Sequence, residues 1–180
     1  MEYPDGRQGF ISQDEAQKLS KWREKVGHDA ASILRTAHSM MGIPYMWGGT
    51  SPKGVDCSGF VRTVLYLHDI IIPRNASQQA KVGKRIQPQD DYADLQPGDL
   101  LFFGSKNQDG SPKRVVHVGI SLGGCRFIHS LGYVHTGSFN PLDADYDEYE
   151  RNRFLFAARI LPYVNQDTQI RSTDNISLYQ

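Results

Sequence analysis

The 180-residue chain is predicted to adopt an α+β fold, because its helical segments come first and its strand-like segments follow. Apolar residues recur at helical spacing over 29–41, where Gly42 and Pro44 stop the helix. A second helix is expected over about 58–68 and a short third helix over 75–80. The strand-like segments lie near 100–103, 115–122, 126–130 and 155–160.

The composition is that of a single globular domain without a footprint for nucleic acid. Lys and Arg number 20, as do Asp and Glu, so the formal net charge is zero, whereas nucleic-acid-binding domains carry clustered positive charge. A chain of this length can bury about two-thirds of its unfolded surface, which is enough for a core of its own. No apolar stretch is long enough to span a bilayer, and the first residues do not resemble a signal peptide.

Cys57 is the leading candidate for a reactive side chain, because it lies between a turn segment rich in glycine and an apolar helix. The positive end of a helix dipole and its unpaired N–H groups stabilise a thiolate, which is the form that attacks carbonyl carbon. A lone cysteine is often only a small buried hydrophobe. Here Asp56 and Ser58 are residues that favour helix caps, and Gly59 removes bulk near the sulfur. We therefore expect a nucleophilic thiol at a helix start.

Two of the six histidines lie in strand-like segments and are candidates for the base that a thiol needs. His117 falls in the β-branched run 115–122 and His129 in 125–130, with a short glycine-containing loop between them that predicts a β-hairpin. Their separation of 12 residues is even, so an ordinary register places both side chains on one face, unless a bulge at the glycines alters it. The remaining histidines are expected to be surface residues or internally satisfied: His28, His38, His68 and His135.

One thiol and two imidazoles in this arrangement predict nucleophilic catalysis by the thiol. His117 is assigned as the base that takes the thiol proton and later donates it to a leaving amine, and His129 as the group that orients the ring of His117. The alternative is a zinc site built from Cys57, His117 and His129. No Cys-x-x-Cys or His-Glu-x-x-His spacing supports it, and no metal or organic cofactor is predicted.

Six segments that include these residues resemble, in order, the successive motifs of the NlpC/P60 cysteine peptidases, over roughly residues 30–162. The segments are 44–49, 56–61, 73–79, 95–103, 117–120 and 127–130. The resemblance implies a papain-like α+β domain, in which helices pack on an antiparallel sheet. It also implies a substrate, the stem peptides or muropeptides of bacterial peptidoglycan, with cleavage at the γ-D-glutamyl to diamino acid bond.

The resemblance further implies which side chains line the groove beside the nucleophile: Tyr45, Trp47, Asp56, Ser58 and Ser77. Tyr45 matches a tyrosine whose hydroxyl points into the groove, and Asp56 and Ser58 match positions that meet the substrate's free α-amino group in some relatives. Simpler interpretations stay open, since helix-start polar residues are caps, a tyrosine or tryptophan packs in a core, and a helix-face serine is solvated. The backbone N–H of the nucleophile is the expected oxyanion donor.

Three segments are predicted along the chain: an N-terminal arm over 1–28, a catalytic domain over 29–162 and a polar tail over 163–180 that frays or lies on the surface. Residues 2–11 read as two strands around a Pro-Asp-Gly turn and resemble the last hairpin of a bacterial SH3 domain. The alternative is an arm that lies on the catalytic domain.

A linker helix is expected over 12–22, where Ser12 and Glu15 form a capping-box pattern. In relatives that act on free muropeptides, the preceding SH3 module closes one end of the groove. An SH3-type module missing from the chain would therefore leave recognition of the substrate's L-Ala end undefined.

Other features receive plainer interpretations. The acidic stretch 143–150 is expected to be a solvated loop rather than a metal site, and Cys125 an ordinary strand residue, since a disulfide would remove the nucleophile. Two alternative functions stay open, a papain-like amidase or acyltransferase acting on another amide or ester, and a catalytically silent module that binds peptidoglycan. The family acts in the cell envelope, on extracellular wall or on recycled peptides in the cytoplasm, and the sequence does not choose among them.

Overall fold

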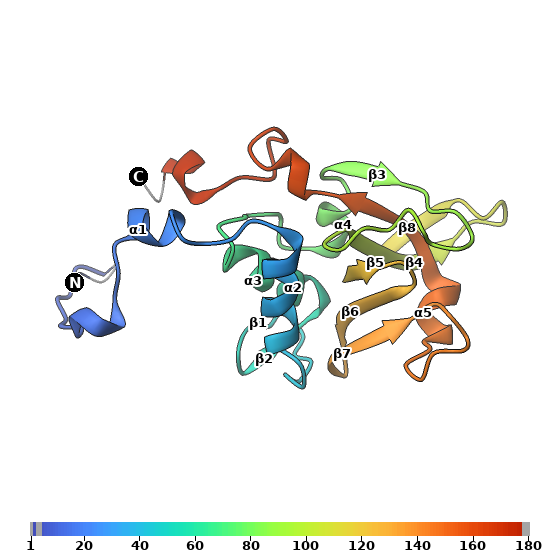
Figure 1. Ribbon diagram of the computed structural model, residues 1–180, viewed down its shortest axis with the longest axis horizontal. Coiled ribbons are helices and arrows are strands. Elements are labelled where there is room, and N and C mark those ends of the chain that lie inside the picture. Colours follow the sequence, from blue (N-terminus) through green and yellow to red (C-terminus); the bar gives the residue numbers. More distant parts are fainter. Residues whose placement is uncertain (1, 3–4, 178–180) are drawn as a thin grey trace.

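A six-stranded antiparallel sheet forms the centre of the computed structural model, which describes residue 2 and residues 5–177 (Figure 1). The strand order is β3-β8-β4-β5-β6-β7, and each neighbouring pair is antiparallel. The strands are β3 (Lys84–Ile86), β4 (Leu100–Lys106), β5 (Pro112–Gly123), β6 (Arg126–Leu131), β7 (Tyr133–Ser138) and β8 (Phe154–Arg159). A separate ribbon pairs β1 (Thr50–Ser51) with β2 (Gly54–Val55).

Helices lie on both sides of this sheet. The helices are α1 (Leu19–Arg23), α2 (Ala30–Ser39), α3 (Cys57–Tyr66), α4 (Ala76–Gln79) and α5 (Glu148–Arg153), with 3-10 turns at Gln13–Glu15, Leu161–Tyr163 and Thr173–Asn175. Helices α2 and α3 pack together on one side, and α5 lies on the other (Figure 1).

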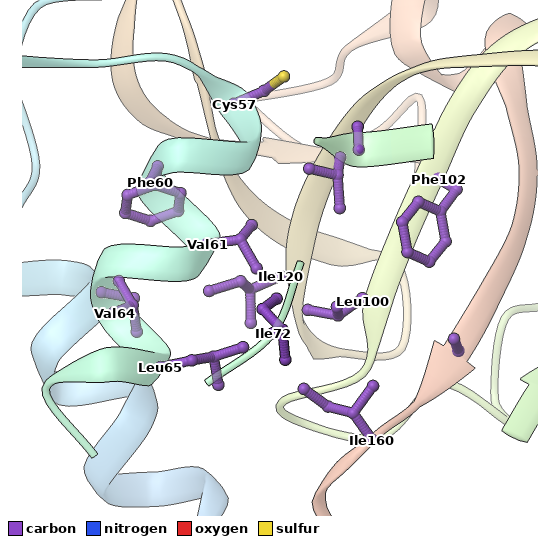
Figure 2. Packing of buried hydrophobic residues seen from close by; sticks show 14 of the residues in the cluster. Cys57, Phe60, Val61, Val64, Leu65, Ile72, Leu100, Phe102, Ile120 and Ile160 are labelled. Atoms are coloured by element: carbon purple, nitrogen blue, oxygen red, sulfur yellow. The ribbon is translucent and has the colours of Figure 1, made fainter. Parts of the chain in front are cut away.

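Strand β4 shows why the sheet is buried on both faces. Successive side chains of a strand point to opposite faces, and accordingly Leu100 and Phe102 join the core that α2 and α3 cover, while Leu101 and Phe103 join a second core on the other face. Figure 2 shows Leu100 and Phe102 facing the apolar side of α3. All four side chains are fully buried, which explains the continuous apolar run in the sequence.

The predicted α+β order is confirmed, and the structure contains further elements that the sequence did not predict. Helix α2 begins after Asp29, whose carboxylate accepts the Ser32 N–H at 2.9 Å, and the predicted strands are present as β4, β5, β6 and β8. Strand β7 was not predicted, because its sequence is polar and it is held by pairing with β6. The prediction of a solvated loop over 143–150 is wrong at its end, because α5 forms there and buries Glu150 completely.

The N-terminal segment differs from the predicted linker helix. A 3-10 turn and α1 replace one continuous helix, because Ala16 between them is extended. The Ser12 hydroxyl accepts the Asp14 N–H, not a bond from Glu15. Of the predicted hairpin over 2–11, the structure contains a bridge between Glu2 and Gln8, whereas residues 3 and 4 of that hairpin lie outside the described residues.

The C-terminal segment packs against the domain. Ile170 is fully buried and Arg171 forms a bridge with Ile71. The Asp69 carboxylate accepts the Thr173 N–H at 3.0 Å and the Thr173 hydroxyl at 2.6 Å. The prediction that this tail frays or lies on the surface is therefore wrong for Ile170, Ser172 and Thr173, which are buried. In the described part of the chain, no helix combines the length and the apolar character needed to cross a membrane.

Candidate active site

Asp56 fixes the start of α3 and so the position of Cys57. Its Oδ1 accepts the Gly59 N–H at 2.6 Å as the helix cap, and its Oδ2 accepts the Gly48 N–H at 3.0 Å. The guanidinium of Arg74 donates to both oxygens, at 3.0 and 2.6 Å. Burial alone would raise the pKa of Asp56, but Arg74 and the two N–H groups outweigh it and lower that pKa. The ionised carboxylate therefore joins three chain segments at the nucleophile.

Glycine is required at position 59, because a neighbouring loop passes directly against the first turn of α3. A Cβ on Gly59 would lie 2.0 Å from the carbonyl oxygen of Gly49. The same carbonyl accepts the Asp56 N–H at 3.2 Å, so the loop is fastened to the helix start. The absence of a side chain at Gly59 thus lets this loop form one wall beside Cys57.

Cys57 is the first residue of α3, as predicted, and its sulfur points away from the apolar core (Figure 2). The residue is nevertheless only 8% exposed. Burial, and then the negative charge of Asp56, raise the pKa of the Cys57 thiol above its ordinary value. Hydrogen bonds from backbone N–H groups, including that of Val118, lower the pKa of Cys57 but do not offset this rise. The helix dipole therefore does not make Cys57 a resting thiolate, because its raised pKa favours the neutral thiol.

The two predicted histidines meet on one face of the sheet. Gly119 of β5 pairs with His129 of β6, which puts His117 and His129 on the same side, and the register shift lies between Ser121 and Gly123. Nε2 of His117 is 2.9 Å from Nδ1 of His129, so one ring donates a hydrogen bond to the other. Burial lowers the pKa of His117 to about 3 and that of His129 to about 2. Both rings are neutral near pH 7.

Strand β5 also connects this pair to the thiol. The Val118 N–H that acts on the Cys57 sulfur directly follows His117 in the chain. Among the described residues, no hydrogen bond joins the Cys57 sulfur to the His117 ring. Catalytic hydrogen bonds are often long in unliganded enzymes and shorten when substrate binds.

Helix α5 adds two carboxyl groups to the buried side of the histidines. Oε1 of Glu150 is 3.9 Å from Nε2 of His117, and Oδ2 of Asp147 is 3.8 Å from Nε2 of His129. Burial raises the pKa of Glu150 to about 7, although Arg153 donates to Oε1 at 3.1 Å. Donor atoms of His117, His129 and Glu150 all lie within 4.8 Å of one another.

The alternative zinc site of Cys57, His117 and His129 is not the group that the described residues bring together, because Glu150 and not Cys57 lies with the two histidines. A cation at that cluster would also have to displace the proton shared by the two rings at 2.9 Å. The geometry fits a hydrogen-bonded chain better than a metal site.

Comparison with known proteins gives a consistent family. The NlpC/P60 family model matches residues 42–154. The chain belongs to the NlpC/P60 family. A γ-D-glutamyl-L-lysine dipeptidyl-peptidase of Bacillus subtilis is 38% identical over 121 residues, which are 67% of this chain and 37% of that protein. This chain therefore spans little more than a third of that relative.

Solved structures agree with this assignment. An NlpC/P60 family protein from Bacillus cereus matches with a TM-score of 0.63 and 31% identity, over 74% of this chain and 41% of its own. The NlpC/P60 domain of the peptidoglycan hydrolase SagA matches with a TM-score of 0.58 and 32% identity, over 73% of this chain and 99% of its own. The helix-and-antiparallel-sheet fold implied by the resemblance is thus confirmed.

The residues expected to line the groove do gather around the nucleophile of this NlpC/P60 domain. One concave surface is formed by Tyr45, Trp47, Gly48, Asp56, Cys57, Ser58, Arg74, Asn75, Ala76, Ser77, Arg114, Val115 and Val116. The indole of Trp47 is 88% exposed, so its core interpretation is wrong. Burial and the nearby Cys57 raise the pKa of Tyr45. Asp56 is already bound by Arg74 and two backbone N–H groups, which limits its part in binding an amine.

Some residues of the site were missed by the sequence analysis. Arg74 was quoted only as part of a motif, yet it holds Asp56 and also donates to the Ser58 hydroxyl at 3.0 Å. His135, predicted to be a surface or internally satisfied residue, lies on β7 with its ring centroid 4.5 Å from that of His129. Cys125 lies in the turn before β6 and is a free thiol. His68 is satisfied as predicted, by Thr36 and the Gly27 carbonyl.

Proposed function

We propose that this domain is a cysteine peptidase that cleaves peptidoglycan stem peptides at the γ-D-glutamyl to diamino acid bond. The observation that carries the proposal is the thiol of Cys57 at the start of α3, beside a strand whose His117 is hydrogen-bonded to His129. Family membership supports the class of reaction. The Bacillus subtilis relative named for γ-D-glutamyl-L-lysine cleavage supports the choice of bond.

The reaction begins from neutral partners, because the pKa of Cys57 is raised and that of His117 is lowered to about 3. The thiol proton passes to His117 as the sulfur attacks the γ-carbonyl carbon, and a C–S bond forms. The carbonyl oxygen becomes an oxyanion, which accepts a hydrogen bond from the backbone N–H of Cys57 at the positive end of α3. The C–N bond then breaks, and the proton on His117 goes to the departing amine.

Water completes the cycle by hydrolysing the thioester. His117 takes a proton from the attacking water, the C–S bond breaks, and the proton returns to the sulfur. His129 holds the ring of His117 through the 2.9 Å hydrogen bond. Because both rings are buried and neutral, His117 is able to accept a proton without first losing one.

Substrate recognition is assigned to the groove residues Tyr45, Trp47, Asp56, Ser58 and Ser77. The exposed face of Trp47 and the hydroxyl of Tyr45 offer an apolar wall with a polar edge. Asp56 and Ser58 supply negative charge and a hydroxyl for an α-amino group, although the bonds from Arg74 already occupy much of the Asp56 carboxylate. Asp56 therefore acts on the amine chiefly through its charge.

The test is product analysis by mass spectrometry on defined muropeptides. An L-Ala-γ-D-Glu-diamino acid peptide should be cut after γ-D-Glu, and Cys57→Ala should abolish cleavage while Cys125→Ala, a matched change at the other free thiol, leaves it intact. Acetylation of the L-Ala amine reports whether a free N-terminus is needed. Undiminished turnover by the folded Cys57→Ala protein would refute the proposal.

A further inference from the structure

Nε2 of His129 is a buried nitrogen that takes no part in the hydrogen bond between the two histidines. Its Nδ1 is 2.9 Å from Nε2 of His117, whereas its Nε2 has no hydrogen-bond partner among the residues that the structure describes, and the side chain is 0% exposed. The Oδ2 atom of Asp147 lies 3.8 Å from this Nε2. A buried polar group without a partner is costly, so a carboxylate this near to an unpartnered nitrogen needs an explanation.

The proton positions in the pair have two possible arrangements. If His129 carries its proton on Nε2, its Nδ1 accepts a hydrogen bond from Nε2–H of His117, and Nδ1 of His117 is left unprotonated as a base. If His129 carries its proton on Nδ1, the direction reverses, and neutral His117 bears its proton on Nδ1 and cannot accept another there. The protonation of Nε2 on His129 therefore decides whether His117 can act as a base.

We propose that Asp147 is a positioning residue that holds His129 in the Nε2–H form and so leaves Nδ1 of His117 free to take the thiol proton. The inference rests on the proposed function and extends it to a chain of four groups: Cys57, His117, His129 and Asp147. The negative charge of a carboxylate 3.8 Å from Nε2 attracts an N–H and repels a lone pair, so it favours the productive arrangement electrostatically.

The orientation of Asp147 is fixed by a second task. Its Oδ1 accepts the Glu150 N–H at 2.9 Å as the cap of α5, and its own N–H donates to the Ser138 carbonyl at 2.8 Å. With Oδ1 occupied, Oδ2 is the oxygen turned toward His129. The capping hydrogen bond therefore fixes the orientation in which Oδ2 of Asp147 faces Nε2 of His129.

Glu150, Arg153 and His135 also surround the pair, and Glu150 acts in the same direction as Asp147 but at the other ring. Glu150 of α5 faces Nε2 of His117 at 3.9 Å and is held by Arg153, and it also favours a proton on that nitrogen. His135 of β7 packs with its ring centroid 4.5 Å from that of His129. Of these groups, Asp147 is the carboxylate placed at the free Nε2 of His129.

Two substitutions separate capping from positioning. Asp147→Ser keeps an oxygen that can cap α5 but removes the negative charge beside Nε2 of His129. Asp147→Asn also caps through its oxygen, which turns its NH2 group toward Nε2 of His129 and stabilises the unproductive arrangement. We expect kcat to fall on the order of tenfold in the first and a hundredfold in the second, with KM nearly unchanged. Asp29→Ser, the same change at the cap of α2, should retain full activity.

A second readout does not depend on turnover. NMR of isotope-labelled imidazole nitrogens should find the proton of His129 on Nε2 in the parent protein and on Nδ1 in Asp147→Asn. If Cys57→Ala is inactive but both Asp147 variants match the parent protein in kcat and proton position, the inference is overturned and the proposed function stands. If Cys57→Ala is active, the proposed function fails, and the proton positions in Asp147→Asn still decide the role of Asp147.

Discussion

Glu150→Gln should remove a pH dependence of stability that burial imposes on this domain. The Glu150 side chain is 0% exposed, and its pKa is raised from 4.5 to about 7, chiefly by burial. The unfolded chain therefore loses this proton near pH 4.5 and the folded domain only near pH 7. Between these values the folded state binds more protons, so stability falls as the pH rises. Each pKa unit is worth about 1.4 kcal/mol, which gives a total loss of about 3 kcal/mol.

Urea denaturation of the parent protein and the variant at about pH 4.5 and about pH 8 measures this effect. The free energy of unfolding of Glu150→Gln, relative to the parent protein, should rise by about 3 kcal/mol between the two values. Other titrating groups are shared by both proteins and largely cancel. Glu148→Gln, at an exposed position of the same helix, should show no such rise. An equal difference in unfolding free energy at both pH values for Glu150→Gln would refute the reasoning.

Three further predictions concern the packing and charges of the site. Gly59→Ala places a Cβ 2.0 Å from the Gly49 carbonyl, so we expect a loss of about 1–3 kcal/mol in thermal unfolding; an unchanged Tm contradicts the close approach. Arg74→Met removes the cation that pairs with Asp56, and chemical denaturation should show that the free energy of unfolding falls by about 1.5–3 kcal/mol. An unchanged free energy of unfolding would contradict the stabilising role of this ion pair. The two buried histidines have folded pKa values of about 3 and about 2. As the pH falls below about 6.5, the unfolded rings bind protons while the folded rings do not. The free energy of unfolding should therefore fall by up to about 1.4 kcal/mol per pH unit for each histidine. Replacing both by Asn should flatten that slope, and an unchanged slope would count against their burial as neutral rings.

The parts of the site that the sequence predicted depend on local patterns. Cys57 at a helix start follows from the cap residue Asp56 and the apolar run after it. The meeting of His117 and His129 follows from their even separation in a tight hairpin. The register shift lies between Ser121 and Gly123, at the end of β5 next to the turn, and both side chains stay on one face. Such features require no knowledge of the rest of the chain.

The parts that were missed depend on tertiary structure. Helix α5 lies in an acidic stretch that local reasoning assigns to solvent, and Glu150 becomes buried only because that helix packs over the histidines. The helix dipole favours a lowered pKa for Cys57, but burial in the folded chain outweighs the dipole and raises that pKa. For Trp47 the sequence left both a groove position and core packing open, and only the folded loop, which leaves the residue 88% exposed, excludes the core.

The central claim is that Cys57 carries the acyl group, and intact-protein and peptide mass spectrometry of acid-quenched turnover mixtures tests it directly. With an L-Ala-γ-D-Glu-diamino acid peptide, we expect a dipeptidyl adduct on the fragment that contains Cys57, present in Cys125→Ala and absent in Cys57→Ala. An adduct on another residue, or continued cleavage by the folded Cys57→Ala protein, would contradict the claim.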